Sequence, residues 1–434
     1  MTTSTTLTDG SDHATLGARP TGTPLDPAEA DLLLGAAVRT DEGRQDPYEA
    51  YRRLREGAPR YFSASGAVVV ADYAGCLEVL RNPALGRSEP DMDVPPGMSG
   101  RERRTGERQH SMLFANPPDH TRLRSLVSRT FTPRRIEAMR PRIEALLAPI
   151  LDEMAERGTV DVLEVLGARL PAAVISELLG VPPELHDTLA PHVRASTAFI
   201  DAAADDDAIA AAEAGVAVMG EVFEQLITEK RRSPDDGLLS ALIQVEEAGD
   251  RLSHEELLAN TGLMYAAGFE TTTNLIGNGL LALLQHPDEL ARLRADRSLL
   301  PSATWELLRW DSPVQLNMRA ALSETEVFGE TMPYGRLFTV LQGSANRDEA
   351  TYPDADRLDV GRFVDRSTPP PLSFGWGPHH CLGAALARAE GEVVFGGLLD
   401  RFASIELVEH PTYRSSFTLR GLRSLLVNVT ESHS

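Results

Sequence analysis

The chain has 434 residues, of which 42% are hydrophobic and 24% are charged, and its formal net charge is −22. This composition is typical of a globular protein with ample core material, and so negative a chain is an unfavourable partner for nucleic acid. The two cysteines, Cys76 and Cys381, cannot form a disulfide framework, so the reducing cytoplasm is the expected location.

The first 28 residues differ in composition from the rest. They are rich in Thr, Ser and Gly and contain no apolar segment of the signal-peptide type, so we expect residues 1–28 to form a disordered tail. No apolar run in the chain reaches about 18 residues, so no membrane-spanning helix and no membrane partner are expected. Residues 29–434 are predicted to form a single domain, because motifs from every third of the chain have to converge on one site.

Helical periodicity dominates the chain, taken in order. It predicts helices over residues 46–56, 72–81, 136–157, 166–179, 190–197, 208–231, 253–285 and 384–399, with another helix opening near residue 116. Strands are predicted over 60–62 and 67–70, in a hairpin over 325–334 and within 407–429. The fold class is therefore mainly α with small β-sheets.

A glycine-rich turn precedes the last long helix and carries Cys381 to its start. A helix N-terminus has unpaired N–H groups and partial positive charge, which lower the pKa of a cysteine there. One thiolate without a second nearby cysteine does not suit zinc but does suit haem iron. The alternative is a buried structural cysteine in a glycine-rich loop.

The same stretch fits the pattern Phe-Gly-x-Gly-x-His-x-Cys-x-Gly at all six fixed positions: Phe374, Gly375, Gly377, His379, Cys381 and Gly383. Here the chain resembles the cytochrome P450 family, in its soluble bacterial form. The resemblance implies a single triangular prism of helices around haem b. It also implies that Cys381 is the axial ligand of the haem iron, and that Phe374 and Gly375 lie beside the cofactor.

Two cations of the predicted helix near residue 116, His120 and Arg124, are four residues apart and share one helical face. Such a pair suits a carboxylate, although a solvated basic face is the alternative. The resemblance implies that both hold haem propionates together with His379 and Arg319. The wider Arg-rich segment, residues 101–135, is then a candidate docking surface for an acidic electron donor.

The middle of the long helix over 253–285 contains Gly268, Glu270 and Thr271, in a sequence of glycine and consecutive threonines that weakens a helix. The resemblance implies a dioxygen groove here, lined by Ala267 and Gly268, with Thr271 and Glu270 as the catalytic pair that delivers protons. A helix that merely tolerates a glycine is the alternative.

Glu306 and Arg309 are three residues apart and are expected to pair on a helix. In the family such a pair is joined by a later arginine. We assign Arg357 to that place, although Ala355 and Leu358 depart from the family pattern. All three residues are expected to be structural.

The resemblance places the substrate against residues 98–110, 198–207, 263–271, 314–318 and 416–419, with residues 198–207 as part of a lid. The substrate-contact candidates are Ala267, Val314, Asn317, Phe417 and Thr418. Because these segments are mostly small and apolar near the haem, we expect a medium or large apolar metabolite, such as a secondary metabolite.

The function implied is a haem-thiolate monooxygenase that inserts one atom of O2 into a C–H bond or a C=C bond. Electrons are expected from NAD(P)H through a reductase and a ferredoxin or flavodoxin. Two alternatives remain: a peroxide-dependent or oxidative-coupling member of the family, and a non-catalytic haem sensor or carrier. The intact Glu270–Thr271 pair favours oxygen activation over both.

Overall fold

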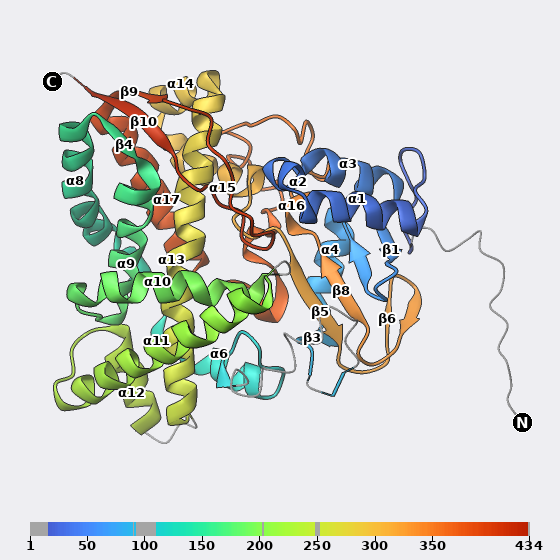
Figure 1. Ribbon diagram of the computed structural model, residues 1–434, viewed down its shortest axis with the longest axis horizontal. Helices are drawn as coiled ribbons and strands as arrows, with labels where there is room; N and C mark the ends of the chain where they lie inside the picture. Colours follow the sequence, from blue (N-terminus) through green and yellow to red (C-terminus); the bar gives the residue numbers. More distant parts are fainter. Residues whose placement is uncertain (1–15, 90, 93–109, 202–203, 248–251, 433–434) are drawn as a thin grey trace, which may run out of the picture.

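The computed structural model describes residues 16–89, 91–92, 110–201, 204–247 and 252–432. Helices fill one side of the molecule and a small sheet with its flanking helices forms the other (Figure 1). The predicted class, mainly α with small β-sheets, is confirmed. None of the helices in these ranges is long and apolar enough to cross a bilayer.

The helix α13 (His254–Gln285) runs through the helical side as a spine of 32 residues (Figure 1). It begins at a capping box, in which the Ser253 hydroxyl accepts the Glu256 N–H and the Glu256 carboxylate accepts the Ser253 N–H. Most of its side chains are buried, because it packs against α9 (Arg169–Leu179), α11 (Asp206–Arg232), α15 (Leu300–Trp310) and α17 (Ala384–Arg401).

The remaining helices surround this spine or cover the sheet. They are α1 (Pro27–Arg39), α2 (Asp41–Gln45), α3 (Tyr48–Gly57), α4 (Tyr73–Arg81), α6 (Asp119–Thr130), α7 (Pro133–Glu137), α8 (Arg140–Arg157), α10 (His186–Ser196), α12 (Leu238–Glu247), α14 (Pro287–Ala295) and α16 (Gln342–Ala345). A π-helical turn, η2 (Leu163–Gly167), leads into α9, and short 3-10 turns include η4 (Thr197–Ile200), η6 (Leu372–Phe374) and η7 (Gly377–His379).

The largest sheet has five strands in the order β1 (Arg60–Phe62), β2 (Val68–Val70), β8 (Leu337–Val340), β5 (Asn317–Ala321) and β3 (Leu85–Gly86). Its pairs are antiparallel except β2 with β8. A second sheet joins β4 (Thr159–Asp161), β10 (Leu426–Glu431) and β9 (Phe402–Leu407), and β6 (Thr325–Val327) pairs with β7 (Glu330–Met332) as the predicted hairpin.

Close helix packing at the centre depends on glycines that face neighbouring side chains. A Cβ at Gly279 of α13 would lie 2.6 Å from the Phe395 ring of α17, and one at Gly391 of α17 would lie 2.9 Å from the Thr304 methyl of α15. These contacts let α13, α15 and α17 approach each other beneath the functional site.

Several predicted boundaries are wrong; for example, the helix expected over 190–197 begins at His186, as α10. The helix expected over 136–157 is divided into α7 and α8, and Pro141 stands in the first turn of α8, where a proline is favoured. Part of the expected tail is ordered: Leu16 is buried and donates its N–H to Arg60 O at 3.0 Å, and α1 begins at Pro27 behind the Asp26 cap. Residues 1–15 lie outside the described residues.

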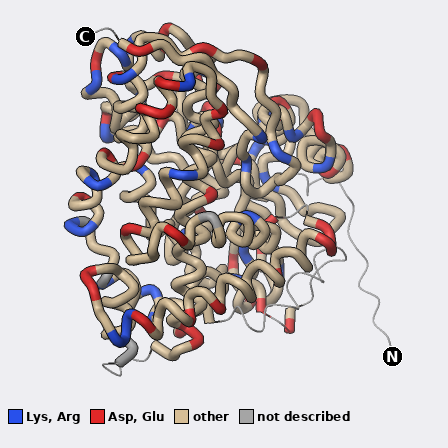
Figure 2. The backbone as a smooth tube through the Cα atoms, turned by 60° about the vertical axis from the view of Figure 1, so that its left-hand side comes forward, with Lys and Arg blue, Asp and Glu red and all other residues tan. Residues whose placement is uncertain are grey.

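Acidic positions are spread over the backbone rather than gathered on one face (Figure 2). This distribution matches the net charge of −22. The local exceptions, where cations collect, lie in the interior and are described next.

Candidate functional site

A cavity of about 1640 Å³ lies between the middle of α13 and the loop that precedes α17. Its wall includes Cys381, His379, Phe374 and Gly375 on one side and Ala267, Gly268, Glu270 and Thr271 on the other. Residues far apart in the sequence therefore meet at one site, as the motifs predicted.

The loop before α17 holds its shape through two glycines with positive φ. Gly375 has φ 64° and Gly377 has φ 69°, and a Cβ at Gly377 would lie 2.2 Å from Leu80 O. The Cys381 N–H donates to Phe374 O at 2.9 Å and closes the loop. These constraints deliver Cys381 to the start of α17, with its side chain accessible from the cavity.

The expected lowering of the Cys381 pKa is wrong for the protein alone. Burial raises the pKa of the thiol, and this effect exceeds the lowering by the N–H groups of Gly383 and Ala384 and by the Arg124 guanidinium. A bound metal ion would oppose this effect, because coordination favours the deprotonated thiol.

A cluster of arginine and histidine side chains lines or backs the cavity near Cys381. The predicted members are His120, Arg124, Arg319 and His379. The His120 and His379 rings lie 4.0 Å apart between centroids, and His120 Nε2 is buried without a hydrogen-bond partner in the described part of the chain. Arg124 Nη2 donates to His380 O at 2.6 Å, and Arg319, on β5, is 2% exposed.

Arg87, which directly follows β3, also belongs to this cluster, although no sequence pattern predicted it. Its guanidinium is buried, which lowers its pKa to about 10, and Nη1 donates to Asn317 Oδ1 at 3.2 Å. Arg319 donates to the same oxygen at 2.5 Å. No motif marks Arg87, because only the tertiary pairing of β3 with β5 brings it to the site.

Without a bound anion, burying these basic side chains close together is electrostatically unfavourable. Burial, together with neighbouring cations, lowers the pKa of His120 to about 4 and lowers the pKa of His379 further. Burial, followed by Arg87, holds the pKa of Arg319 well below its usual value. Two carboxylates placed here would offset this repulsion, and one of them would give the buried His120 Nε2 a hydrogen-bond partner.

The middle of α13 forms another part of the cavity wall, within one continuous helix. The Thr271 hydroxyl donates to Ala267 O at 2.8 Å, one turn earlier, and this bond competes with the helical backbone pattern. Gly268 lines the cavity, but a Cβ there would lie 3.1 Å from Ile175 of α9, so its missing side chain also serves helix packing. Glu270 lines the wall and pairs with Arg414, from the loop between β9 and β10.

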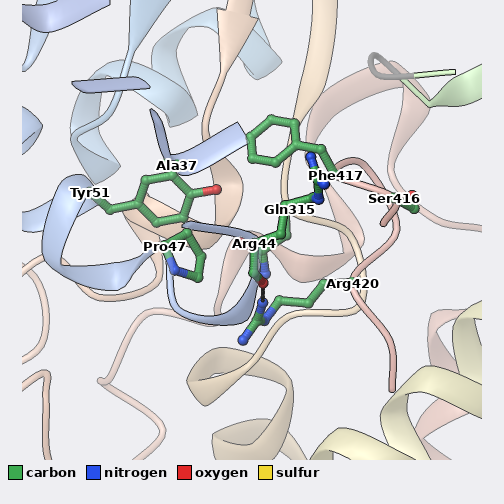
Figure 3. A pocket seen from close by; sticks show the side chains of 8 residues that line it. All are labelled: Ala37, Arg44, Pro47, Tyr51, Gln315, Ser416, Phe417 and Arg420. Carbon is green, nitrogen blue, oxygen red and sulfur yellow. Dashed lines mark hydrogen bonds between the residues drawn. The ribbon is translucent and has the colours of Figure 1, made fainter. Parts of the chain in front are cut away.

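The substrate-contact candidates divide into two groups. Ala267, Val314, Asn317 and Thr418 line the cavity. Phe417 does not: its ring lines a second, small pocket with Tyr51 and Gln315 (Figure 3). Ser416 and Phe417 line the small pocket, whereas Thr418 and Leu419 line the large cavity, so the bend at residues 417–418 divides the segment between the two pockets.

Other parts of the cavity wall come from η4 and from residues 110–117. Of the segments expected to contact substrate, residues 98–109 and 202–203 lie outside the described residues.

The structural ion pair is present, with one correction. Glu306 and Arg309 are fully buried and share two hydrogen bonds of 2.7 and 2.8 Å. The third member is Arg362, whose Nε lies 3.2 and 3.1 Å from the two Glu306 oxygens. Arg357 is wrong as a member, because its side chain is 67% exposed and lies 3.9 Å from Glu289. The sequence Asp359-x-x-Arg362-Phe363 could have located the correct arginine.

The residues present fit a haem group. The cavity is lined by an accessible cysteine and by the oxygen-groove candidates of α13. The cluster of arginines and histidines beside it could bind two carboxylates. The cavity volume also exceeds the roughly 300–1,000 Å³ of an ordinary ligand pocket, which leaves room for a cofactor and a substrate together.

Comparisons with known proteins agree with this geometry. The family model described as Cytochrome P450 matches residues 210–420. Cytochrome P450 107B1 of Saccharopolyspora erythraea is 39% identical over 89% of this chain and 96% of its own. The 6-deoxyerythronolide B hydroxylase of the same organism is 36% identical over 90% and 98%. Ligand-free CYP164A2 of Mycobacterium smegmatis superposes with a TM-score of 0.83 at 35% identity, over 92% and 100%. The chain therefore belongs to the cytochrome P450 family.

Proposed function

We propose that this haem monooxygenase oxidises a medium-sized or large, mostly apolar metabolite, by hydroxylation or epoxidation. The cavity volume and its largely apolar wall support this substrate class. A related chain that is named a 6-deoxyerythronolide B hydroxylase supports hydroxylation as the first reaction to test, with secondary metabolites as the first compounds.

One observation carries the assignment: the Cys381 side chain is accessible from the cavity rather than packed in the core, and it lines the same cavity as Thr271 of α13. Cys381 would hold the iron, and His120, His379, Arg87, Arg124 and Arg319 would hold the propionates. When bound, the haem supplies the oxygen-activating chemistry, and the protein supplies the ligand, the position and the protons.

Thr271 and Glu270 are the proposed catalytic pair. The Thr271 hydroxyl donates its hydrogen to Ala267 O, so the hydroxyl oxygen remains able to accept a hydrogen bond on the cavity side. Glu270 is buried next to it, and one of its carboxylate oxygens has no hydrogen-bond partner among the described residues. A carboxylate in that state can pass protons toward the hydroxyl.

The electron supply is proposed as NAD(P)H, through a reductase and a ferredoxin or flavodoxin. The docking surface is proposed to lie beside the cysteine loop, where the exposed Arg81 stacks 5.0 Å from the Trp376 ring centroid and Arg134 of α7 is exposed. Arg122, another cation of this region, is already paired with Glu256 and Asp119. The cytoplasm is the proposed location, on the ground of the cysteine content.

The decisive test replaces each cysteine in turn. Cys381→Ser should remove the absorption band that a thiolate-ligated haem gives in the reduced, CO-bound state. Cys76→Ala is the matched control: Cys76 is fully buried behind β2, away from the cavity wall, so this variant should keep the band. A Cys381→Ser protein with an unchanged band would refute the ligand assignment.

Dependence on the oxidant separates the remaining alternatives. The proposal requires consumption of O2 that depends on NAD(P)H and the redox partner. Turnover with hydrogen peroxide alone, and none with O2 and electrons, would instead identify a peroxide-dependent enzyme. Haem binding without oxygen consumption across a broad compound screen would identify a sensor or carrier.

A further inference from the structure

Glu270 is held from outside α13 by a residue that no motif marks. Its side chain is 4% exposed, and Oε1 pairs with Arg414 Nη1. Oε2 is buried, with no hydrogen-bond partner among the described residues, on a side chain that lines the cavity. An unsatisfied buried carboxylate oxygen costs stability, so its place on the wall of a reaction site calls for a functional reason.

Arg414 reaches Glu270 from the loop between β9 and β10. Its backbone N–H donates to Gly421 O at 2.9 Å, and Nη2 donates to Asn274 Oδ1 at 2.5 Å. Asn274 follows Glu270 by four residues and shares its helical face. The guanidinium therefore clamps two successive turns of α13, while 31% of the side chain remains exposed to solvent.

The loop is shaped to admit this clamp. A Cβ at Gly421 would lie 2.0 Å from Asn274 Oδ1 and 2.5 Å from Arg414 Nη2. Any side chain at position 421 would push the guanidinium or the amide away from its present partner. The contact between Arg414 and Glu270 thus depends on Gly421, which carries no charge and whose close neighbours are Asn274 and Arg414.

We propose that Arg414 is a positioning residue for proton delivery. It fixes Glu270 with one oxygen toward the cavity, and it forms the exposed end of the route by which solvent protons enter. The Glu270 carboxylate would take a proton from water at the Arg414 side and pass it to the Thr271 hydroxyl on the cavity side, and a second water would then restore the starting state. Arg414 takes no part in the proton transfer itself, and its ion pair holds the Glu270 side chain in place.

This inference rests on the proposed function, so the test separates the two. The holoenzyme is supplied with saturating ferredoxin, reductase and NADPH, and oxygen consumption is measured in H2O and in D2O. Wild-type protein must first show the thiolate-type reduced-CO band and NADPH-dependent oxygen consumption. If wild type fails that step, the proposed function is wrong, whatever the variants do.

With an active wild type, Arg414→Gln should lower the rate of oxygen consumption roughly 3- to 30-fold, a part of the 10²–10⁴ that positioned proton transfer contributes. It should also increase the solvent isotope effect, because proton delivery becomes rate-limiting. Arg414→Lys keeps the cation and should recover most of the rate. Arg423→Gln, in the same loop, is the matched control and should behave as wild type.

Gly421→Ala supplies an independent variant, since it displaces the clamp without altering any charge. Gly421→Ala should reproduce the lower rate of oxygen consumption and the larger solvent isotope effect. If Arg414→Gln loses its haem, the result for Gly421→Ala tests the proposal in its place. An unchanged isotope effect in a fully haem-loaded variant, or no recovery with lysine, overturns the proposal. A slower rate with an unchanged isotope effect would mean that Arg414 serves stability or partner docking only.

Discussion

Arg362 illustrates how burial determines the contribution of a single charged side chain to the free energy of unfolding. Its side chain is 10% exposed and bonds Glu306, which is fully buried. Arg362→Ala would leave the inner pair with fewer charged hydrogen bonds and should lower the free energy of unfolding by about 1.5–3 kcal/mol. Arg357→Ala, at the exposed position, should change it by about 0.5 kcal/mol or less. Thermal unfolding of the two holoproteins compares them directly, and equal losses would contradict the assignment.

Glu390 of α17 gives the pH dependence of stability a testable sign. It lines the cavity, and burial raises its pKa to about 8. The folded state therefore binds a proton that the unfolded state releases near pH 4.5, and stability falls as pH rises from there to 8, by at most about 1.4 kcal/mol per pH unit. Above pH 8 this loss is complete.

Glu390→Gln removes that titration, so the variant should gain in unfolding temperature over wild type at pH 8 and much less at pH 5. Glu144→Gln, at an exposed site on α8, is the control and should show no such difference. A constant gap between Glu390→Gln and wild type at both pH values would show that this carboxyl is not held neutral.

The residues found from the sequence are those whose chemistry requires a fixed local spacing. Cys381 with its glycines, the Glu270–Thr271 pair and the His120–Arg124 pair are such cases, and all lie at or directly behind the cavity wall. Arg87 and Arg414 were not predicted from the sequence, because strand pairing brings Arg87 to the site and a distant loop brings Arg414 there. Phe417 was misplaced because the sequence does not show how the bend at residues 417–418 directs the side chains on either side of it.

At the scale of helices, glycines on the inner faces set how closely α13 and α17 pack. Gly279→Ala would press a methyl group into the Phe395 ring at 2.6 Å and should destabilise the protein by about 1–3 kcal/mol. Gly220→Ala on α11 meets nothing within 4 Å and should stabilise it by about 0.4–1 kcal/mol. Opposite shifts of the unfolding temperature are expected, and shifts of the same sign would contradict this account.

Long amphipathic or capped helices were predictable, since periodicity and the Ser253–Glu256 box located α13 within one residue. Boundaries near proline were less so, as the division of α7 from α8 shows. The ordered segment from Leu16 to Asp26 was missed because its contacts are backbone hydrogen bonds to distant residues, which composition does not reveal.

For the whole molecule, a net charge of −22 makes docking of an acidic electron donor depend on local cations. Arg81→Glu, beside the cysteine loop, should lower the second-order rate of reduction by ferredoxin and weaken its dependence on salt. Arg39→Glu, exposed at the end of α1, makes the same charge change elsewhere and is the control. Stopped-flow reduction at several ionic strengths measures both, and equal effects would place the docking surface elsewhere.

The cavity wall is formed partly by packed helices and partly by loop segments, and this difference has a practical consequence. Cys381 lies on the loop that leads into α17, and Thr271 lies on α13, which packs against α17, whereas η4 and the segments 110–117, 313–316 and 416–419 supply much of the remaining wall. Peripheral pieces of this kind tolerate exchange far better than a packed interior does. A library that recombines those four segments among relatives should therefore yield catalysts with altered compound preference, while leaving the oxidising machinery intact.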